Sequence, residues 1–170
     1  MATITASVRD PEPNQPMPHQ LNVVLIEPEI PNNTGSIGRL CLATQSTLHL
    51  VDPLGFEIND TQLKRAGLDY WQHLDVVRHP GRNEFFASIP EGAPLAFFSK
   101  KAKTLYSEHR FQPGSYLIFG KETKGLSEEL MQKYAGQTFR IPLYDTRVRS
   151  LNLSNAVSIV VYEAIRQLGM

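Results

Sequence analysis

Short apolar segments alternate with segments of helical spacing along most of this chain, and no other feature of the sequence restricts the fold as strongly. Buried strands that alternate with helices form a mostly parallel sheet with helices on its faces. We therefore predict an α/β fold. The predicted strands span residues 21–27, 48–51, 74–79, 94–99, 115–120 and 139–143, and the predicted helices span 33–44, 60–68, 82–89 and 127–135, with a closing helix from Ser154.

The length of the chain predicts one domain. At 170 residues there is room for a single compact core. Residues 1–20 are rich in Pro, Asn and Gln, and such a segment buries too little apolar surface to offset the entropy lost on ordering. We predict a disordered N-terminal arm over 1–20 and one domain over 21–170. The arm contains neither a long apolar run nor a small-residue cleavage pattern, so we expect no signal peptide and no membrane anchor.

Charge and cysteine content limit the possible ligands. Basic and acidic residues are equal at 17 each, so a site for a polyanion must come from local clusters. Cys41 is the only cysteine, and the five histidines lack the spacing of a metal site. We predict no metal, no membrane association and a cytoplasmic location. Basic residues cluster as Lys64 and Arg65, as Lys100, Lys101 and Lys103, and as Arg147 and Arg149.

Loops that leave the predicted strands after Ser99, Gly120 and Leu143 should meet at one edge of the sheet, where ligands of such folds bind. The loop FGKETKGL (119–126) has two glycines, which allow a ligand to approach the backbone closely. It matches neither the Walker A motif nor the dinucleotide fingerprint, so the loop does not favour ATP or NAD as the ligand. A plain strand-to-helix turn stays open as the alternative.

The segment PNNTGSIGR (31–39) predicts a helix start with Asn33 or Thr34 as cap. Gly35 and Gly38 fall on one helical face, where each costs up to about 1 kcal/mol relative to alanine. We expect another backbone, a partner chain or a substrate to approach that face closely. Arg39 beside them is either a solvated side chain or a contact to phosphate or ribose.

The closing segment combines a polar turn with an apolar helix. Asn152 or Ser154 is the expected cap. The helix is too apolar for one buried face, so we predict that a second face is covered in a homodimer. Its main stripe is Val157, Val160, Val161, Ala164 and Leu168, and Ala156, Ile159 and Ile165 lie off it.

Together, PNNTGSIGR (31–39), FGKETKGL (119–126) and IPLYDTRVRSLNLSNAVSIVVYEAIRQ (141–167) resemble the three motifs of the SpoU branch of the SPOUT RNA methyltransferases. The resemblance covers residues 21–170, and three long motifs in order make it specific. It implies the SPOUT fold with a C-terminal deep trefoil knot, although general topology rules argue against knots. It also implies S-adenosylmethionine as cofactor, enclosed by the loops after Gly120 and Leu143.

The resemblance also implies roles for individual residues. Arg39, with Asn33 near it, would face the substrate ribose from the partner subunit of a homodimer. The family describes this arginine as a possible general base, but a guanidinium keeps its proton, so we expect it to clamp phosphate or stabilise a developing alkoxide. The cofactor would contact Phe98, Gly120, Glu122, Gly125, Ile141, Ser150, Leu151 and Asn155.

Within this branch, the chain is most similar to compact enzymes that methylate the ribose 2′-hydroxyl of the wobble nucleotide, cytidine or modified uridine 34, of leucine tRNAs. The implied partner is the anticodon stem-loop of tRNA, held by the dimer itself. Two alternatives stay open: 2′-O-methylation of another tRNA or ribosomal RNA nucleotide, and a catalytically silent RNA-binding module. The segment YDTRV (144–148) is variable in the family, so the resemblance gives it no role.

Overall fold

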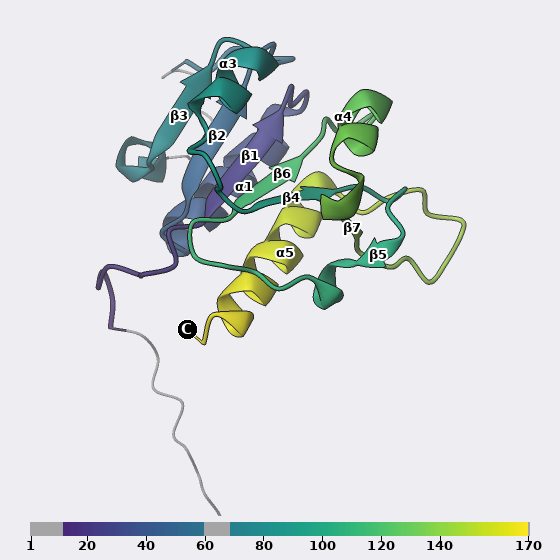
Figure 1. Ribbon diagram of the computed structural model, residues 1–170. Helices are drawn as coiled ribbons and strands as arrows, with labels where there is room; N and C mark the ends of the chain where they lie inside the picture. The colour runs from purple at the N-terminus through teal and green to yellow at the C-terminus, as the bar shows by residue number, and fades with distance from the viewer. Residues whose placement is uncertain (1–11, 60–68, 170) are drawn as a thin grey trace, which may run out of the picture.

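The computed structural model describes residues 12–59 and 69–169 of the chain. Within these residues, one sheet has the strand order β3-β2-β1-β6-β4-β7-β5, and each pair of neighbours runs parallel (Figure 1). This confirms the predicted α/β class, whereas the trefoil knot stays a prediction. The strands are β1 (Asn22–Ile26), β2 (Thr47–Val51), β3 (Val76–His79), β4 (Leu95–Phe98), β5 (Thr104–Leu105), β6 (Tyr116–Phe119) and β7 (Thr138–Arg140).

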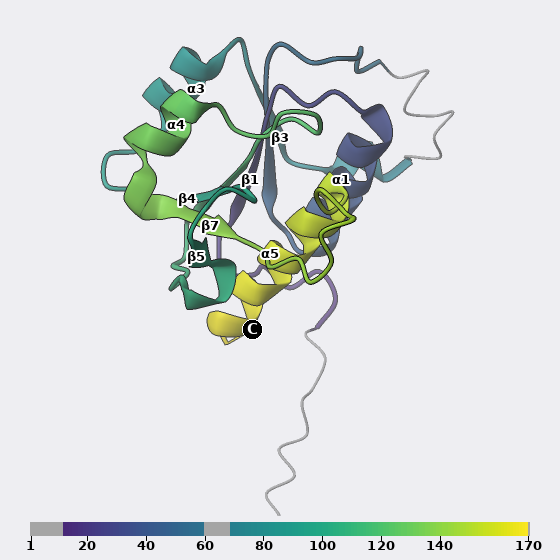
Figure 2. The ribbon, with the colours of Figure 1, turned by 90° about the vertical axis from the view of Figure 1, so that its right-hand side faces the viewer.

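Helices cover both faces of the sheet (Figure 2). On one face α1 (Pro31–Ala43) lies beside α5 (Leu153–Gln167), and on the other lie α3 (Arg82–Ser88) and α4 (Glu128–Lys133). Because successive residues of a strand point to opposite faces, Val23 and Leu25 join the core under α1 and α5 while Val24 joins the core under α3 and α4. The described residues also form three 3₁₀ helices: η1 (Asp69–His73), η2 (Tyr106–Glu108) and η3 (Ala135–Gln137).

Helix α1 begins two residues earlier than predicted. Its N-cap is Ile30, which has no side-chain cap bond, and Pro31 opens the first turn. Proline suits that position because the amide it lacks would have no partner within the helix. The prediction of Asn33 or Thr34 as cap is therefore wrong, and both side chains are buried.

Helix α5 begins at Leu153, one residue before the predicted Ser154, and its cap is Asn152. The Asn152 side chain accepts from the amides of Ser154 at 2.9 Å and Asn155 at 3.4 Å. The cap of α4 is Ser127, whose hydroxyl accepts from the Leu130 amide at 3.3 Å.

Within the described residues, the other predicted strands and helices differ from the observed ones by one to three residues at one or both ends, and two of these differences have a clear cause. Helix α4 ends at Lys133 instead of residue 135, because the chain tightens into η3. Strand β7 ends at Arg140 instead of residue 143, since residues 141–143 leave the sheet. The two-residue strand β5 was not predicted, because it is too short to show a hydrophobic pattern.

The two glycines of α1 are approached by this chain itself. A Cβ on Gly38 would lie 2.6 Å from a ring carbon of Trp71, which belongs to η1. The neighbouring Tyr70 donates its hydroxyl hydrogen to the Gly35 carbonyl at 2.9 Å. A close approach was predicted, but it comes from aromatic side chains of η1, which were not among the expected neighbours.

Part of the predicted arm contacts the domain. His19 is fully buried, its Nδ1 accepts from the Leu21 amide at 3.0 Å, and its Nε2 lies 2.7 Å from the Thr44 carbonyl. Ordered packing thus begins before residue 21. The predicted helix 60–68 and its Lys64 and Arg65 lie outside the described residues. Among the helices that the structure describes, none is both long and apolar enough to span a bilayer.

Candidate active site

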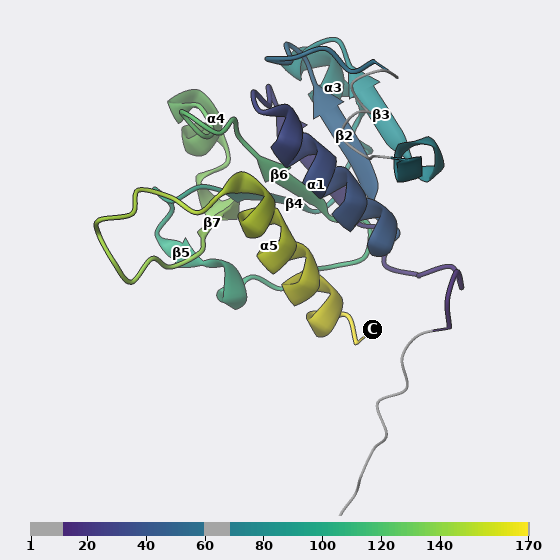
Figure 3. The same ribbon diagram turned by 180° about the vertical axis from the view of Figure 1, so that it is seen from behind.

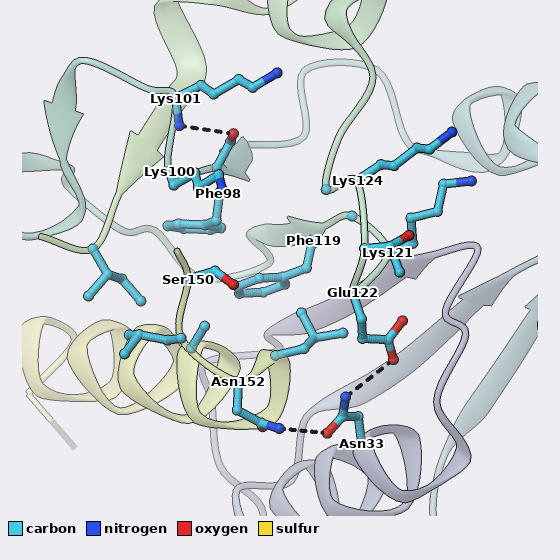
Figure 4. Close-up of a pocket in the computed structure, with 18 of the residues that line it drawn as sticks. Asn33, Phe98, Lys100, Lys101, Phe119, Lys121, Glu122, Lys124, Ser150 and Asn152 are labelled. Atoms are coloured by element: carbon cyan, nitrogen blue, oxygen red, sulfur yellow. Dashed lines mark hydrogen bonds between the residues drawn. The ribbon is translucent and has the colours of Figure 1, made fainter. Parts of the chain in front are cut away.

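A cavity of about 740 Å³ opens at the carboxyl ends of β4, β6 and β7 (Figure 4). Its walls are residues 98–101 after β4, residues 119–125 after β6 and residues from 141–153 after β7, with Ile30 and Asn33 from the start of α1. The prediction that the loops after Ser99, Gly120 and Leu143 meet at one edge is confirmed.

Most residues that the resemblance singled out line this cavity. Two do not, although both lie in the described part of the chain: Arg39 is exposed on α1, and Asn155 is exposed in the first turn of α5. Arg39 lies close enough to Tyr70 to oppose the rise that burial gives to the pKa of that phenol. Those that line the cavity are Asn33, Phe98, Gly120, Glu122, Gly125, Ile141, Ser150 and Leu151.

One side of the cavity is apolar. The rings of Phe98 and Phe119, at the ends of neighbouring strands, stack with centroids 4.9 Å apart and planes at 17°. Ile141, Leu143 and Leu151 also contribute to the lining. A flat, apolar wall of this kind suits the ring system of a small ligand, with the backbone of the loops to provide hydrogen bonds.

Glycine at position 120 is required by the backbone of its own loop. A Cβ there would overlap the main-chain atoms of Gly125 and Leu126. The loop folds back on itself, since Lys121 and Gly125 form an antiparallel bridge and the Gly125 amide donates to the Lys121 carbonyl at 2.9 Å. Gly125 has φ +64°, a left-handed conformation that glycine adopts without strain.

The Glu122 carboxylate is held by the segment before α1. It accepts from the amides of Glu29 at 2.7 Å and Ile30 at 3.0 Å, and from the side-chain amide of Asn33 at 3.4 Å. The carboxylate therefore satisfies backbone donors at the start of α1 from more than ninety positions away in the sequence. Placing negative charge there also favours the helix dipole.

Asn33 joins this carboxylate to the start of α5. Its Oδ1 accepts from the Asn152 side-chain amide at 3.0 Å, while its Nδ2 donates to Glu122 (Figure 4). Sequence reasoning identified Asn152 as a cap but missed this second bond, because nothing local marks a partner 119 positions away. The three motifs of the sequence thus meet in one hydrogen-bonded chain.

A second carboxylate makes the reciprocal contact, from the segment before α1 to the loop after β6. Glu29 accepts from the Thr123 amide at 3.1 Å and from the Thr123 hydroxyl at 2.8 Å. The loops before α1 and after β6 therefore each hold the other's backbone with a carboxylate. The sequence analysis did not select Glu29, whose spacing in the sequence shows no partner.

Positive charge surrounds the cavity. Its charged lining residues are Lys100, Lys101, Lys121 and Lys124 against the single acid Glu122. Within the described residues, no group of three or more His, Cys, Asp or Glu is placed to hold a metal ion. The site thus favours an anionic or polyanionic ligand at its mouth.

A model of the SpoU rRNA Methylase family matches residues 20–162, which is most of the chain. The chain belongs to the SpoU methylase family. A family member from Burkholderia pseudomallei, named tRNA (cytidine(34)-2′-O)-methyltransferase, is 43% identical over 150 residues, covering 87% of this chain and 96% of the relative. The predicted recognition is therefore confirmed at the level of the family.

Solved SpoU structures agree with the fold. A structure described as giving insights into the 2-OH methylation of C/U34 on tRNA superposes with a TM-score of 0.84 at 44% identity, covering 90% of this chain and 99% of the other. The SpoU methyltransferase AviRb from Streptomyces viridochromogenes, solved with AdoMet, has a TM-score of 0.75 at 26% identity, covering 89% of this chain and 62% of AviRb.

Proposed function

We propose that this chain is an S-adenosylmethionine-dependent enzyme that methylates the ribose 2′-hydroxyl of nucleotide 34, cytidine or modified uridine, in leucine tRNAs. The observation that carries the proposal is the near full-length match to a relative named for this reaction at cytidine 34. The uridine substrate, the leucine tRNAs and contact with the anticodon stem-loop extend the proposal beyond that name.

The cavity fits the cofactor that the family uses. The stacked Phe98 and Phe119 with Ile141 offer an apolar slot for adenine, and the glycine at position 120 brings the loop backbone to the cavity wall. Bound there, S-adenosylmethionine supplies an activated methyl group for a ribose hydroxyl. The residues around it would then orient the hydroxyl for in-line attack, which is a large part of the catalytic task.

The hydrogen bonds of Glu122 favour a positioning role for it. Its carboxylate already accepts three hydrogen bonds from the α1 segment, so it holds α1 against the cofactor loop. Asn33, which the resemblance placed with Arg39 at the substrate ribose, has both ends of its amide engaged by Glu122 and Asn152. We therefore assign Asn33 to holding α1 and α5 in register at the cavity.

Arg39 serves the reaction as a charged clamp in this proposal. Arg39 lies outside the cavity of its own subunit, which supports the idea that it acts in the cavity of a second subunit. Helix α5 lies beside α1 (Figure 3). Two large apolar side chains of α5 support a homodimer, since Ile159 is 37% exposed and Tyr162 is 55% exposed. A guanidinium placed there would stabilise a phosphate or a developing alkoxide without giving up its proton.

The proposal is tested by transfer of labelled methyl from S-adenosylmethionine into tRNA that lacks the modification, followed by nuclease digestion and identification of the labelled nucleoside. We expect a 2′-O-methylated pyrimidine at position 34 of leucine tRNA. Label in another ribose would overturn the assigned nucleotide, and tight cofactor binding without any transfer to tRNA would point to ribosomal RNA as substrate. Weak cofactor binding without transfer would favour the silent RNA-binding module.

Variants test whether each active site is built from two subunits. Arg39→Ala should lower kcat by at least about a hundredfold, the size expected for removing one electrostatic contact to the transition state. Arg110→Ala, another exposed arginine outside the cavity lining, is the control. Mixing Arg39→Ala with a Ser150→Trp variant should restore activity in heterodimers, because one of the two sites then has an intact arginine and an intact cavity. If the mixture stays inactive, Arg39 does not act across subunits.

A further inference from the structure

The segment between Leu143 and Ser150 projects from the body of the protein (Figure 3). Both of these residues line the cavity, so the residues between them form part of its rim. Tyr144, the first of them, is 95% exposed, more than any other large hydrophobic side chain that the structure describes. A ring held almost wholly in water contributes little packing to the fold of this subunit, so it is free to make a contact outside it.

The rim is folded by contacts that do not involve Tyr144. The Asp145 carboxylate accepts from the Arg147 amide at 2.9 Å and from the guanidinium Nη2 at 2.6 Å. The Val148 amide donates to the Asp145 carbonyl at 3.4 Å. At the far end, Lys100 Nζ donates to the Arg149 carbonyl at 3.2 Å. The rim therefore presents Tyr144 from a turn that is formed before a ligand arrives, which lowers the entropy cost of binding.

Charge around the ring favours nucleic acid over a second copy of this chain. Tyr144 stands beside a cavity with four lysines and one glutamate in its lining, and the next basic residues, Arg147 and Arg149, are also exposed. Three of these cations already pair with carboxylates in the same subunit: Arg147 with Asp145, Lys101 with Glu128 and Lys121 with Glu27. An apolar protein interface would remove water from all of these charges, whereas RNA phosphates would add favourable contacts to them. The exposed Ile159 and Tyr162 on α5 already provide a separate apolar face for a second copy.

We propose that Tyr144 stacks on an unpaired base of the RNA loop whose ribose enters the cavity, and so positions the target nucleotide. The inference rests on the proposed function. Proteins bind single-stranded RNA by combining a basic surface with aromatic side chains on which bases stack. Because every base has an aromatic face, the ring sets the position of the strand and does not choose the base.

The test compares Tyr144→Ala, Tyr144→Leu and Tyr144→Phe for binding to an anticodon stem-loop RNA and for steady-state methyl transfer. Loss of the ring in the Ala and Leu variants should weaken RNA binding and raise KM for tRNA by about tenfold, with kcat and cofactor affinity unchanged. Tyr144→Phe keeps the ring and should bind like the wild type. Val148→Ser, which removes an apolar side chain from the same rim, is the matched control and should also bind like the wild type.

RNAs that each lack one loop base then locate the contact. With the base that stacks removed, wild type and Tyr144→Ala should bind equally. Equal binding of wild type and Tyr144→Leu to intact RNA would overturn the proposal, as would equal losses in the Phe and Ala variants. A shift to monomer in Tyr144→Ala by sedimentation would instead assign the ring to a subunit contact. Wild-type binding without methyl transfer would refute the proposed function and leave the stacking contact measurable.

Discussion

Lowering the pH from about 8 to about 5 is expected to destabilise this protein by about 2 kcal/mol through one buried histidine pair. His49 of β2 and His79 of β3 are both buried, with His49 Nδ1 3.0 Å from His79 Nε2. His49 Nε2 lies 3.0 Å from the Asn22 side-chain oxygen, which can only accept, so that nitrogen carries the hydrogen. His49 Nδ1 therefore accepts from His79 Nε2, and this hydrogen bond is kept only while His49 is neutral.

Burial, and then the charge of His79, lower the pKa of His49 from 6.5 to about 4, although Asp75 opposes the shift. Burial also lowers the pKa of His79. The folded state thus binds fewer protons than the unfolded state between about pH 6.5 and pH 4, and its stability falls as the pH falls through that window. For His49 alone the loss is about 2 kcal/mol at pH 5 and approaches about 3 kcal/mol near pH 4.

Urea unfolding followed by circular dichroism at a series of pH values measures this effect. His49→Gln removes the titrating ring, so the stability difference between wild type and variant should shrink by about 2 kcal/mol between pH 8 and pH 5. His73→Gln, in the exposed end of η1, is the control and should run parallel to the wild type. Parallel curves for His49→Gln and wild type would refute the reasoning.

Two substitutions probe the walls of the cavity. Gly120→Ala should lower the free energy of unfolding by about 3 kcal/mol or more, because its Cβ would overlap rigid backbone. Gly38→Ala should change the free energy of unfolding by only about 1 kcal/mol, since the ring of Trp71 can move. Thermal unfolding compares the two variants, and equal costs would contradict this account. Glu122→Gln should lower the free energy of unfolding by about 1–3 kcal/mol and weaken cofactor binding, because an amide nitrogen would replace one carboxylate oxygen that accepts from the amides of Glu29 and Ile30. Calorimetric titration with S-adenosylmethionine measures the effect on binding. Unchanged stability would show that the carboxylate charge is not needed.

Apolar runs made the central strands predictable. β1, β2, β4 and β6 are buried on both faces, so each appears in the sequence as a mostly apolar stretch, which in β2 is interrupted by His49. The start of α1 was mispredicted because capping preferences describe local contacts. The amides of Glu29 and Ile30, just before the helix, donate to Glu122, which lies far along the chain, and the Asn33 side chain donates to the same carboxylate.

The site was predictable only where strand ends bring motifs together. The loops after β4, β6 and β7 share one edge, so Phe98, Gly120 and Ser150 converge on one cavity. Arg39 and Asn155 belong to the same motifs but lie on outward surfaces of α1 and α5, because helical geometry directs neighbouring residues to different sides. The contact between Asn33 and Asn152 depends on how two helices cross, which a single sequence does not encode locally.

The packing of Trp71 against Gly38 gives this protein an intrinsic optical probe. Trp71 is the only tryptophan in the chain, so its fluorescence arises from one place, the face of α1 that carries the glycines. The indole is half-buried and lies in contact with the turn of α1 that bears Arg39. Its emission should therefore follow events at that helix, such as association of subunits or arrival of RNA, without any attached dye. Fluorescence quenching of the unmodified protein can measure the rates of those events separately from the rate of methyl transfer.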